Sequence, residues 1–225
     1  MAIGSIINHY FFDRSCIYCA KAVLYEPNLL CSKCWNLLEF QGDHVEGADI
    51  LLADDEVYFN ELSTILAYND IIREILHRIK YYDDTRLCSL LAKFIGNYFD
   101  DVISRYDVVT IIPLHYKRML RRKYNQIDLL MRYISGDSKY IYSPDLLMRV
   151  RNTCKQSSLA KLEDKRRNLE NAFSVRSGSR EGVLGRKILI IDDIITSGST
   201  VNNCAKELKR HGASGVGVLA LARAG

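Results

Sequence analysis

The segment ILIIDDIITSGST, residues 188–200, combines residue types that suit a sugar phosphate. Its apolar start predicts a buried strand, and Asp192 and Asp193 follow at the carboxyl end, where ligands bind in open α/β sheets. A loop of small, mostly hydroxyl-bearing residues then leads into a helix, whose first turn offers free backbone N–H groups and partial positive charge. Gly198 permits a close backbone approach. We therefore expect the loop to hold a phosphate and the acids to hold hydroxyl groups beside it.

The same thirteen positions resemble the phosphoribosyl pyrophosphate (PRPP) motif of type I phosphoribosyltransferases. This resemblance implies that Asp192 and Asp193 hold the ribose 2′ and 3′ hydroxyls, while the following loop holds the 5′-phosphate. The positions assigned to PRPP binding on this basis are Ile194, Thr196, Ser197, Gly198, Ser199 and Thr200. The simpler alternative is an ordinary strand-to-helix turn with two solvent-facing acids, and the length of the match argues against it.

Two C-x2-C pairs near the N-terminus predict a metal site. They are Cys16 with Cys19 and Cys31 with Cys34. Four thiolates in two knuckles suit tetrahedral Zn²⁺, and with no open coordination position the site would be structural. An iron–sulfur cluster and a redox-active pair are the alternatives. The other three cysteines are expected to be small buried side chains in a reducing compartment: Cys88, Cys154 and Cys204.

The elements around these motifs alternate between strand and helix, which predicts an α/β fold with a mostly parallel sheet covered by helices. We expect strands at 107–114, 140–150, 187–194 and 216–222, a strand pair within 57–68, and helices beginning at Asn69 or Asp70, at about 86–99, at about 117–134 and from the 196–200 loop to about 210. The cysteine-bearing unit, 16–40, is expected to end in a helix from Trp35 to Phe40. A domain boundary at about residue 50 would separate a metal-binding unit, 1–50, from the main domain, 51–225.

Composition narrows the class of protein further. Apolar residues make up 48% of the 225-residue chain, as in ordinary globular proteins. No apolar stretch reaches the length of a membrane helix, and the N-terminus lacks the basic start of a signal peptide, so we expect a cytoplasmic protein without membrane insertion. Between Lys117 and Arg167 there are fourteen Lys and Arg against five Asp and Glu. This surplus suggests an anionic partner, the simpler alternative being a solvated helical face.

The combination of a cysteine unit with this motif resembles the ComF family of competence-associated proteins, which carry an N-terminal zinc ribbon. Further matches to that family are Lys80-Tyr81, Pro113-Leu114, RRKYNQ at 121–126, Arg149 to Gln156, Arg167-Asn168 and Ala172-Phe173. The chain departs from the family pattern at Lys123 and Asn171, where glycine is usual. It also has about one extra residue between Gln156 and Asn168.

The family resemblance implies an enzyme that binds Mg²⁺–PRPP and transfers ribose-phosphate to an unknown acceptor, in a cell process linked to DNA uptake. Arg118, Arg121 and Arg122 are candidates for the pyrophosphate, and 151–168 resembles a loop that closes over PRPP. The alternative is a non-catalytic PRPP-sensing module that binds single-stranded DNA or a DNA-uptake partner. Its stacking platforms would be Tyr116, Tyr124 and Tyr133. Nucleobase salvage is a third reading, for which only 57–82 could supply a base-recognition hood.

Overall fold

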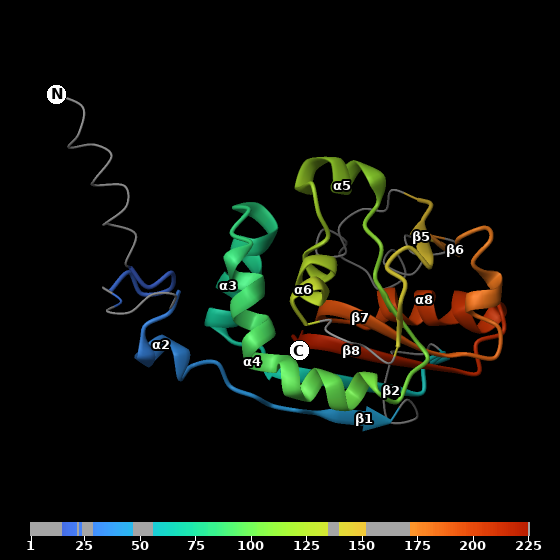
Figure 1. Ribbon diagram of the computed structural model, residues 1–225, viewed down its shortest axis with the longest axis horizontal. Helices are drawn as coiled ribbons and strands as arrows, with labels where there is room; N and C mark the ends of the chain where they lie inside the picture. The colour runs from blue at the N-terminus through green and yellow to red at the C-terminus, as the bar shows by residue number, and fades with distance from the viewer. Residues whose placement is uncertain are drawn as a thin grey trace.

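The computed structural model describes residues 15–21, 23, 29–46, 56–134, 140–151 and 172–224. Its main sheet has six strands in the order β1-β2-β8-β7-β3-β4 (Figure 1). The strands are β1 (His44–Glu46), β2 (Glu61–Ala67), β3 (Val108–Ile111), β4 (Ile141–Tyr142), β7 (Lys187–Ile195) and β8 (Gly215–Arg223). All neighbouring pairs are parallel except β1 with β2. The predicted α/β fold with a mostly parallel sheet is confirmed.

Helices cover both faces of this sheet (Figure 1). On one face, α3 (Asp70–Tyr81), α4 (Arg86–Ile103) and α6 (Gln126–Ile134) pack their apolar sides against β7 residues such as Leu189 and Ile191. On the other face, α8 (Ser199–Arg210) packs against Ile188 and Ile190, together with the hairpin β5 (Leu147–Arg149) and β6 (Phe173–Val175). Successive β7 side chains alternate between these faces, so adjacent residues of β7 meet different helices.

Three expected elements differ in detail from the sequence-based expectation. Instead of a strand pair, 57–68 holds the single strand β2. Its pairing with β8 begins at Asn60, whose N–H donates to the Val216 carbonyl at 2.7 Å and whose Oδ1 accepts the Val216 N–H at 2.9 Å. The helix expected at Trp35–Phe40 is instead α2 (Ser32–Trp35), which begins directly after Cys31. The 140–150 region contains two short strands, β4 and β5.

The helix expected across 117–134 is broken into α5 (Tyr116–Arg122) and α6. Lys123 follows α5 and has a left-handed backbone, φ +66°. Glycine adopts this conformation at the lowest steric cost, which explains why glycine is usual here in the ComF family that the sequence resembles. Asn125 then starts α6, since its side-chain oxygen accepts a hydrogen bond from Ile127 N–H at 3.0 Å. Its amide also donates to the Ile112 carbonyl at 3.0 Å, which ties the break to the end of β3.

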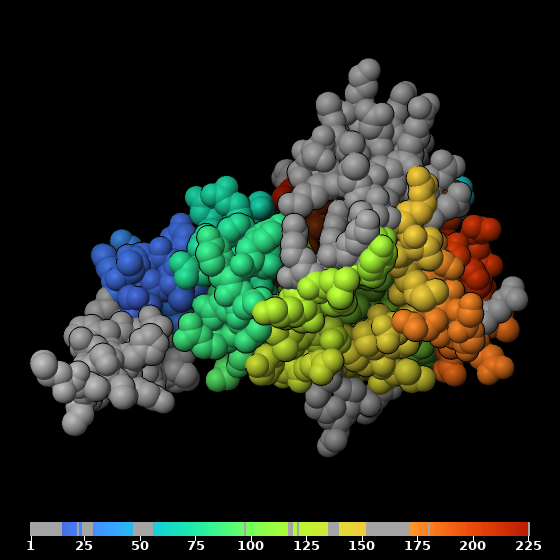
Figure 2. Space-filling model, turned by 90° about the horizontal axis from the view of Figure 1, so that it is seen from above, coloured from blue at the N-terminus to red at the C-terminus, as the bar shows by residue number. Residues whose placement is uncertain are grey.

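The cysteine-bearing segment is packed against the main domain, as the blue and teal surfaces show in Figure 2. Trp35 meets Phe94 of α4 edge to face, with ring centroids 5.5 Å apart, and Phe40 meets Tyr98 in the same way at 4.8 Å. Strand β1, which follows this segment, is hydrogen-bonded to β2 of the main sheet. The expected boundary near residue 50 falls in 47–55, outside the described residues.

Candidate functional site

The motif strand, loop and helix form in the predicted order, with the loop at the carboxyl end of the inner strand β7. β7 runs to Ile195, and Gly198 stands just before α8 with a left-handed backbone, φ +70°. A left-handed N-cap glycine turns the chain sharply without a Cβ clash. No side chain caps α8, so its first backbone N–H groups have no side-chain acceptor in the described part of the chain. These free donors and the helix dipole can receive an anion.

The loop residues themselves present short polar side chains. Thr196 is exposed, whereas Ser197, Ser199 and Thr200 are half-buried. The Ser197 and Ser199 hydroxyls lie 3.1 Å apart and can share a hydrogen bond, and both keep capacity for a further partner. The predicted phosphate-binding residues are thus brought together in one turn.

Asp193 is the more buried of the two motif acids, with 7% of its surface exposed. Its Oδ2 forms an ion pair with Lys80 Nζ from α3 and accepts a hydrogen bond from Gln126 Nε2 of α6 at 2.6 Å. Its Oδ1 accepts the Ile194 N–H at 2.7 Å. Burial opposes ionisation of this carboxyl, but Lys80 and these hydrogen bonds outweigh it and hold the pKa of Asp193 below its ordinary value.

Asp192 is half-buried and lies on the opposite face of β7, toward α8. Its Oδ1 accepts the backbone N–H of Asp193 at 2.8 Å, and no ion pair reaches it from the described residues. Burial and the neighbouring Asp193 charge raise the pKa of Asp192 to about 8. Asp192 is therefore a carboxyl group without a neutralising partner, placed just before the phosphate-binding turn.

Sequence reasoning assigned no role to Lys80 or Gln126, although both fall in segments that match the ComF pattern. The helical periodicity of α3 shows only that Lys80 lies near its C-terminal end. Its contact with β7 depends on how α3 packs across the sheet, which no local signal encodes. Gln126 likewise reaches Asp193 only because α6 begins anew after Lys123.

The candidate pyrophosphate-binding arginines lie on α5, which follows the carboxyl end of β3. The side chains of Arg118 and Arg121 lie outside the described residues. Arg122 is directed toward α3, where its guanidinium carbon lies 5.3 Å from the centroid of the Tyr81 ring and its Nη2 lies 3.4 Å from the Tyr81 hydroxyl. Most of the expected closing loop, 152–168, is also outside the described residues.

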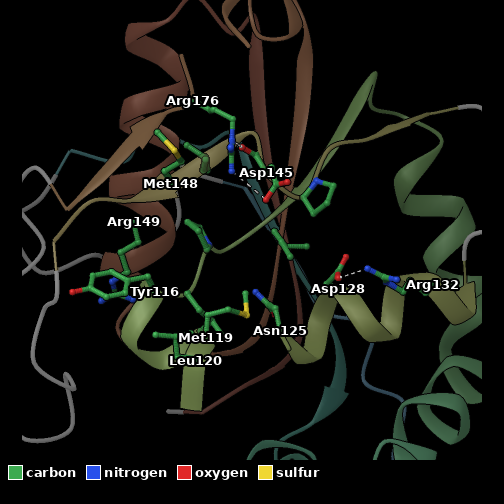
Figure 3. Close-up of a pocket in the computed structure, with 15 residues that line it drawn as sticks. Tyr116, Met119, Leu120, Asn125, Asp128, Arg132, Asp145, Met148, Arg149 and Arg176 are labelled. Carbon is green, nitrogen blue, oxygen red and sulfur yellow. Dashed lines mark hydrogen bonds and ion pairs between the residues drawn. The ribbon is translucent and has the colours of Figure 1, made fainter. Parts of the chain in front are cut away.

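A cavity of about 540 Å³ opens beside the same end of β3 (Figure 3). Its walls come from β3, α5, α6 and β5 and combine apolar side chains such as Met119, Leu120 and Met148 with charged ones. Four of those charged residues form two ion pairs within the wall: Asp128 with Arg132 at 3.1 Å, and Asp145 with Arg176 at 3.4 Å. Among the described residues that line it, none belongs to 192–200, so the cavity is adjacent to the motif rather than part of it.

The four patterned cysteines are brought together. The sulfur atoms of Cys16, Cys19, Cys31 and Cys34 all lie within 4.8 Å of one another, and those of Cys19 and Cys31 are 3.7 Å apart. Zn–S bonds of about 2.3 Å in a tetrahedron would place sulfur atoms about 3.8 Å apart, so the cluster fits a metal such as zinc.

The backbone of the first knuckle also favours a metal-binding thiolate. Burial disfavours ionisation of Cys16, but backbone N–H groups of Cys19, Cys31 and Tyr18 outweigh it and lower its pKa to about 6. By contrast, Cys88 and Cys204 are buried in the cores and away from this cluster, as expected. Burial raises the pKa of Cys88 to about 12 and that of Cys204 well above its usual value, so both thiols are unreactive. Cys154 lies outside the described residues.

No helix in the described parts of the chain is both long enough and apolar enough to cross a bilayer.

Comparison with known proteins places the motif in its family. Residues 156–225 match the phosphoribosyl transferase domain family. The chain is 28% identical to competence protein F of Haemophilus influenzae, over 95% of this chain and 99% of that protein. It is 31% identical to the DNA utilization protein YhgH of Escherichia coli K12, over 73% of each chain, and 29% identical to competence protein ComFC of Streptococcus pneumoniae, over 71% of this chain and 66% of that protein. The chain belongs to the ComF family, and its main domain has the type I phosphoribosyltransferase fold.

Proposed function

We propose that this protein binds Mg²⁺–PRPP at the carboxyl edge of β7 and transfers its ribose-phosphate to an acceptor. One observation carries the proposal. The unneutralised Asp192 carboxyl stands a few residues before a left-handed Gly198 and an α8 N-terminus that no side chain caps. A phosphorylated ribose requires carboxyl oxygens that accept hydrogen bonds from its hydroxyls, next to a turn that binds its phosphate.

The roles of individual residues follow from their places in the fold. The turn from Thr196 to Thr200 would hold the 5′-phosphate, and the ribose would lie beside the acid pair Asp192-Asp193. The pyrophosphate would lie near the loop after β3, where α5 brings Arg118, Arg121 and Arg122. A loop at 151–168 that closes over the ligand would exclude water from the reacting carbon.

Magnesium would enter with the pyrophosphate. The donor set fits this hard cation, because the turn after β7 offers hydroxyl oxygens, and those of Ser197 and Ser199 keep capacity for a further partner. When bound, the ion would neutralise charge on the pyrophosphate.

In the proposed reaction, the bond between ribose C1 and the pyrophosphate oxygen breaks, and C1 forms a bond to the acceptor nucleophile. Pyrophosphate leaves with the bonding electrons, and the acceptor's proton passes to solvent. The chain's task is to anchor the ribose through the acids, hold the phosphate in the turn and stabilise charge on the departing group.

Pyrophosphate release tests this reaction. Purified protein is incubated with Mg²⁺–PRPP and pools of nucleobases, amines and single-stranded oligonucleotides, and pyrophosphate is measured by a coupled assay. Acceptor-dependent release that disappears in Asp192→Asn supports the transferase. Binding of PRPP without release from any pool would favour a non-catalytic PRPP sensor.

The sensor is the second candidate function, and it would act through DNA or a DNA-uptake partner. Tyr116 and Tyr133 are 61% and 52% exposed and could stack on bases. The third expected platform is less suitable, because Tyr124 is half-buried and its hydroxyl donates to the Ile79 carbonyl at 2.6 Å. The names of the Haemophilus influenzae and Escherichia coli relatives refer to competence and DNA utilization, which supports a role in DNA handling. Oligonucleotide binding that weakens steeply with salt would support this candidate.

We further propose that the four-cysteine cluster holds one structural Zn²⁺, and that the protein works in the cytoplasm. The metal would link the first knuckle to α2 and so hold Trp35 against α4. Metal binding would supply much of the folding free energy of this segment.

A further inference from the structure

Three donors converge on Asp193, whereas its neighbour Asp192 receives one. Lys80 reaches Asp193 from α3, Gln126 from α6 and the Ile194 N–H from β7 itself. Asp192 accepts only the Asp193 N–H among the described residues. Two carboxyls that the motif makes equivalent are therefore unequal in this structure.

We propose that Lys80 is a positioning residue of the PRPP site: with Gln126 it fixes and neutralises the Asp193 carboxylate, so that Asp192 is the acid that contacts the ribose hydroxyls. This inference rests on the function proposed above. It divides the work of the acid pair, with Asp193 acting as an anchor within the protein and Asp192 as the ligand-binding group.

Electrostatics explains why such a division is useful. Two adjacent buried carboxylates repel each other and would also repel the phosphates that the neighbouring turn must bind. The Lys80 charge reduces the net charge of the ionised pair from two negative charges to one. Lys80 is itself largely buried, with 18% of its side chain exposed, so water screens this interaction only weakly.

The other groups near the pair do not replace Lys80. On the α3, α4 and α6 face, Cys88 contacts Gln126 through the backbone carbonyl, with its Sγ 3.9 Å from that oxygen, and its raised pKa keeps it neutral. On the opposite face, Cys204 of α8 interacts with the Asp192 charge, and its raised pKa keeps it neutral. Arg149 of β5 and Glu207 of α8 are the charged side chains that also act on Cys204. Lys80 is thus the cation that acts on Asp193 in the described part of the chain, which agrees with the lowered pKa of Asp193.

A purely structural role is the competing explanation, because the ion pair also ties the C-terminal turn of α3 to the sheet. The two roles differ in their effect on the ligand. A structural tie would alter stability but leave the pH dependence of PRPP binding unchanged. A positioning role predicts that removing the charge changes that dependence, and that another cation restores it.

The test is calorimetric titration with Mg²⁺–PRPP between about pH 6 and 9 for the wild type, Lys80→Met, Lys80→Arg and Gln126→Leu. We expect Lys80→Met to weaken binding by about tenfold or more near neutral pH and to move the half-maximal pH upward, because an unneutralised pair resists full ionisation. Lys80→Arg should restore the pH midpoint. Gln126→Leu should weaken binding and move the midpoint upward by less than Lys80→Met does, because the Lys80 charge remains. Lys209→Met, at the far end of α8, is the matched control for loss of one lysine charge.

The outcomes separate the two proposals. If the wild type binds Mg²⁺–PRPP and Lys80→Met binds with the same affinity and midpoint, the positioning role is wrong and the PRPP site stands. If the folded wild type binds no PRPP at any pH, the proposed function fails and the positioning role fails with it. Should Lys80→Met not fold, Lys80→Arg still decides, since a pH midpoint of PRPP binding in Lys80→Arg that differs from that of the wild type contradicts the proposal.

Discussion

Asp192 and Asp193 are consecutive residues of β7, but they lie on opposite faces of the sheet, and their pKa values are shifted in opposite directions. Burial opposes ionisation of Asp193, but Lys80 and Gln126 outweigh it and hold its pKa below the ordinary value. Burial and the Asp193 charge raise the pKa of Asp192 to about 8. This difference predicts opposite effects on the free energy of unfolding for the same Asp→Asn substitution at the two neighbouring positions.

Asp193→Asn should destabilise the unliganded protein. The substitution leaves Lys80 largely buried without its counter-charge, and breaking a buried pair by removing one partner costs about 3–5 kcal/mol. In the wild type, the folded-state pKa of Asp193 is lowered. The ionised Asp193 therefore stabilises the fold fully above its unfolded-state pKa, and this contribution disappears as the pH falls through the folded-state pKa. Urea unfolding at pH 7 and pH 4 measures this, and an equal loss at both pH values would contradict the assignment.

Asp192→Asn should instead stabilise the unliganded protein, by about 1 kcal/mol near neutral pH, because it removes a buried carboxyl that resists ionisation. Because the folded-state pKa of Asp192 is above its unfolded-state pKa, this carboxyl destabilises the folded protein more and more as the pH rises from about 4 toward 8. The gain from Asp192→Asn should therefore be larger at pH 8 than at pH 5. Thermal unfolding at the two pH values provides the comparison, and a gain that shrinks with rising pH would refute the raised pKa.

Lys123→Gly should stabilise the break between α5 and α6. A non-glycine residue at φ +66° carries a steric cost of roughly 1–2 kcal/mol, part of which the greater freedom of glycine in the unfolded chain offsets, leaving a gain of about 0.5–1 kcal/mol. Lys123→Ala is the matched control, since it keeps the strain and removes only an exposed ion pair with Asp83, which contributes little. Equal stability of the glycine and alanine variants in urea would show that the backbone is not strained there.

Metal removal should change the environment of Trp35, the single tryptophan of the chain. Trp35 directly follows Cys34 and packs on Phe94, so chelation is expected to loosen this contact and shift its fluorescence to longer wavelength. Metal analysis should find about one zinc per chain in the wild type. The ion should be absent in Cys34→Ser and retained in Cys88→Ser. Retention of the metal in Cys34→Ser would contradict the four-cysteine site.

Much of the site could be predicted from sequence because its central elements are contiguous. The strand, the acids, the turn and the helix of 188–200 follow one another, and each has a strong local signal in β-branched residues, small residues or glycine. The start of α3 was equally predictable, since Asn69 caps the helix by accepting the Ile72 N–H at 3.1 Å. The two C-x2-C pairs likewise predicted their own convergence.

The remaining features depend on tertiary contacts. The break after Arg122 was missed because Lys123 occupies a backbone conformation that usually requires glycine, so the sequence lacks the usual signal. The interaction of Lys80 with Asp193 joins α3 to β7 across the sheet, and helical periodicity cannot specify that pairing. Asn60 begins β2 through a side-chain bond to β8, another contact between segments far apart in the sequence.

The most direct test of the central claim is calorimetric titration of the zinc-loaded protein with Mg²⁺–PRPP, run beside the Asp192→Asn/Asp193→Asn double variant. We expect saturable binding by the wild type and none by the folded double variant, with ribose 5-phosphate binding more weakly than PRPP because it lacks the pyrophosphate. Absence of binding by the folded wild type, or equal binding by the double variant, would contradict a PRPP site at the end of β7.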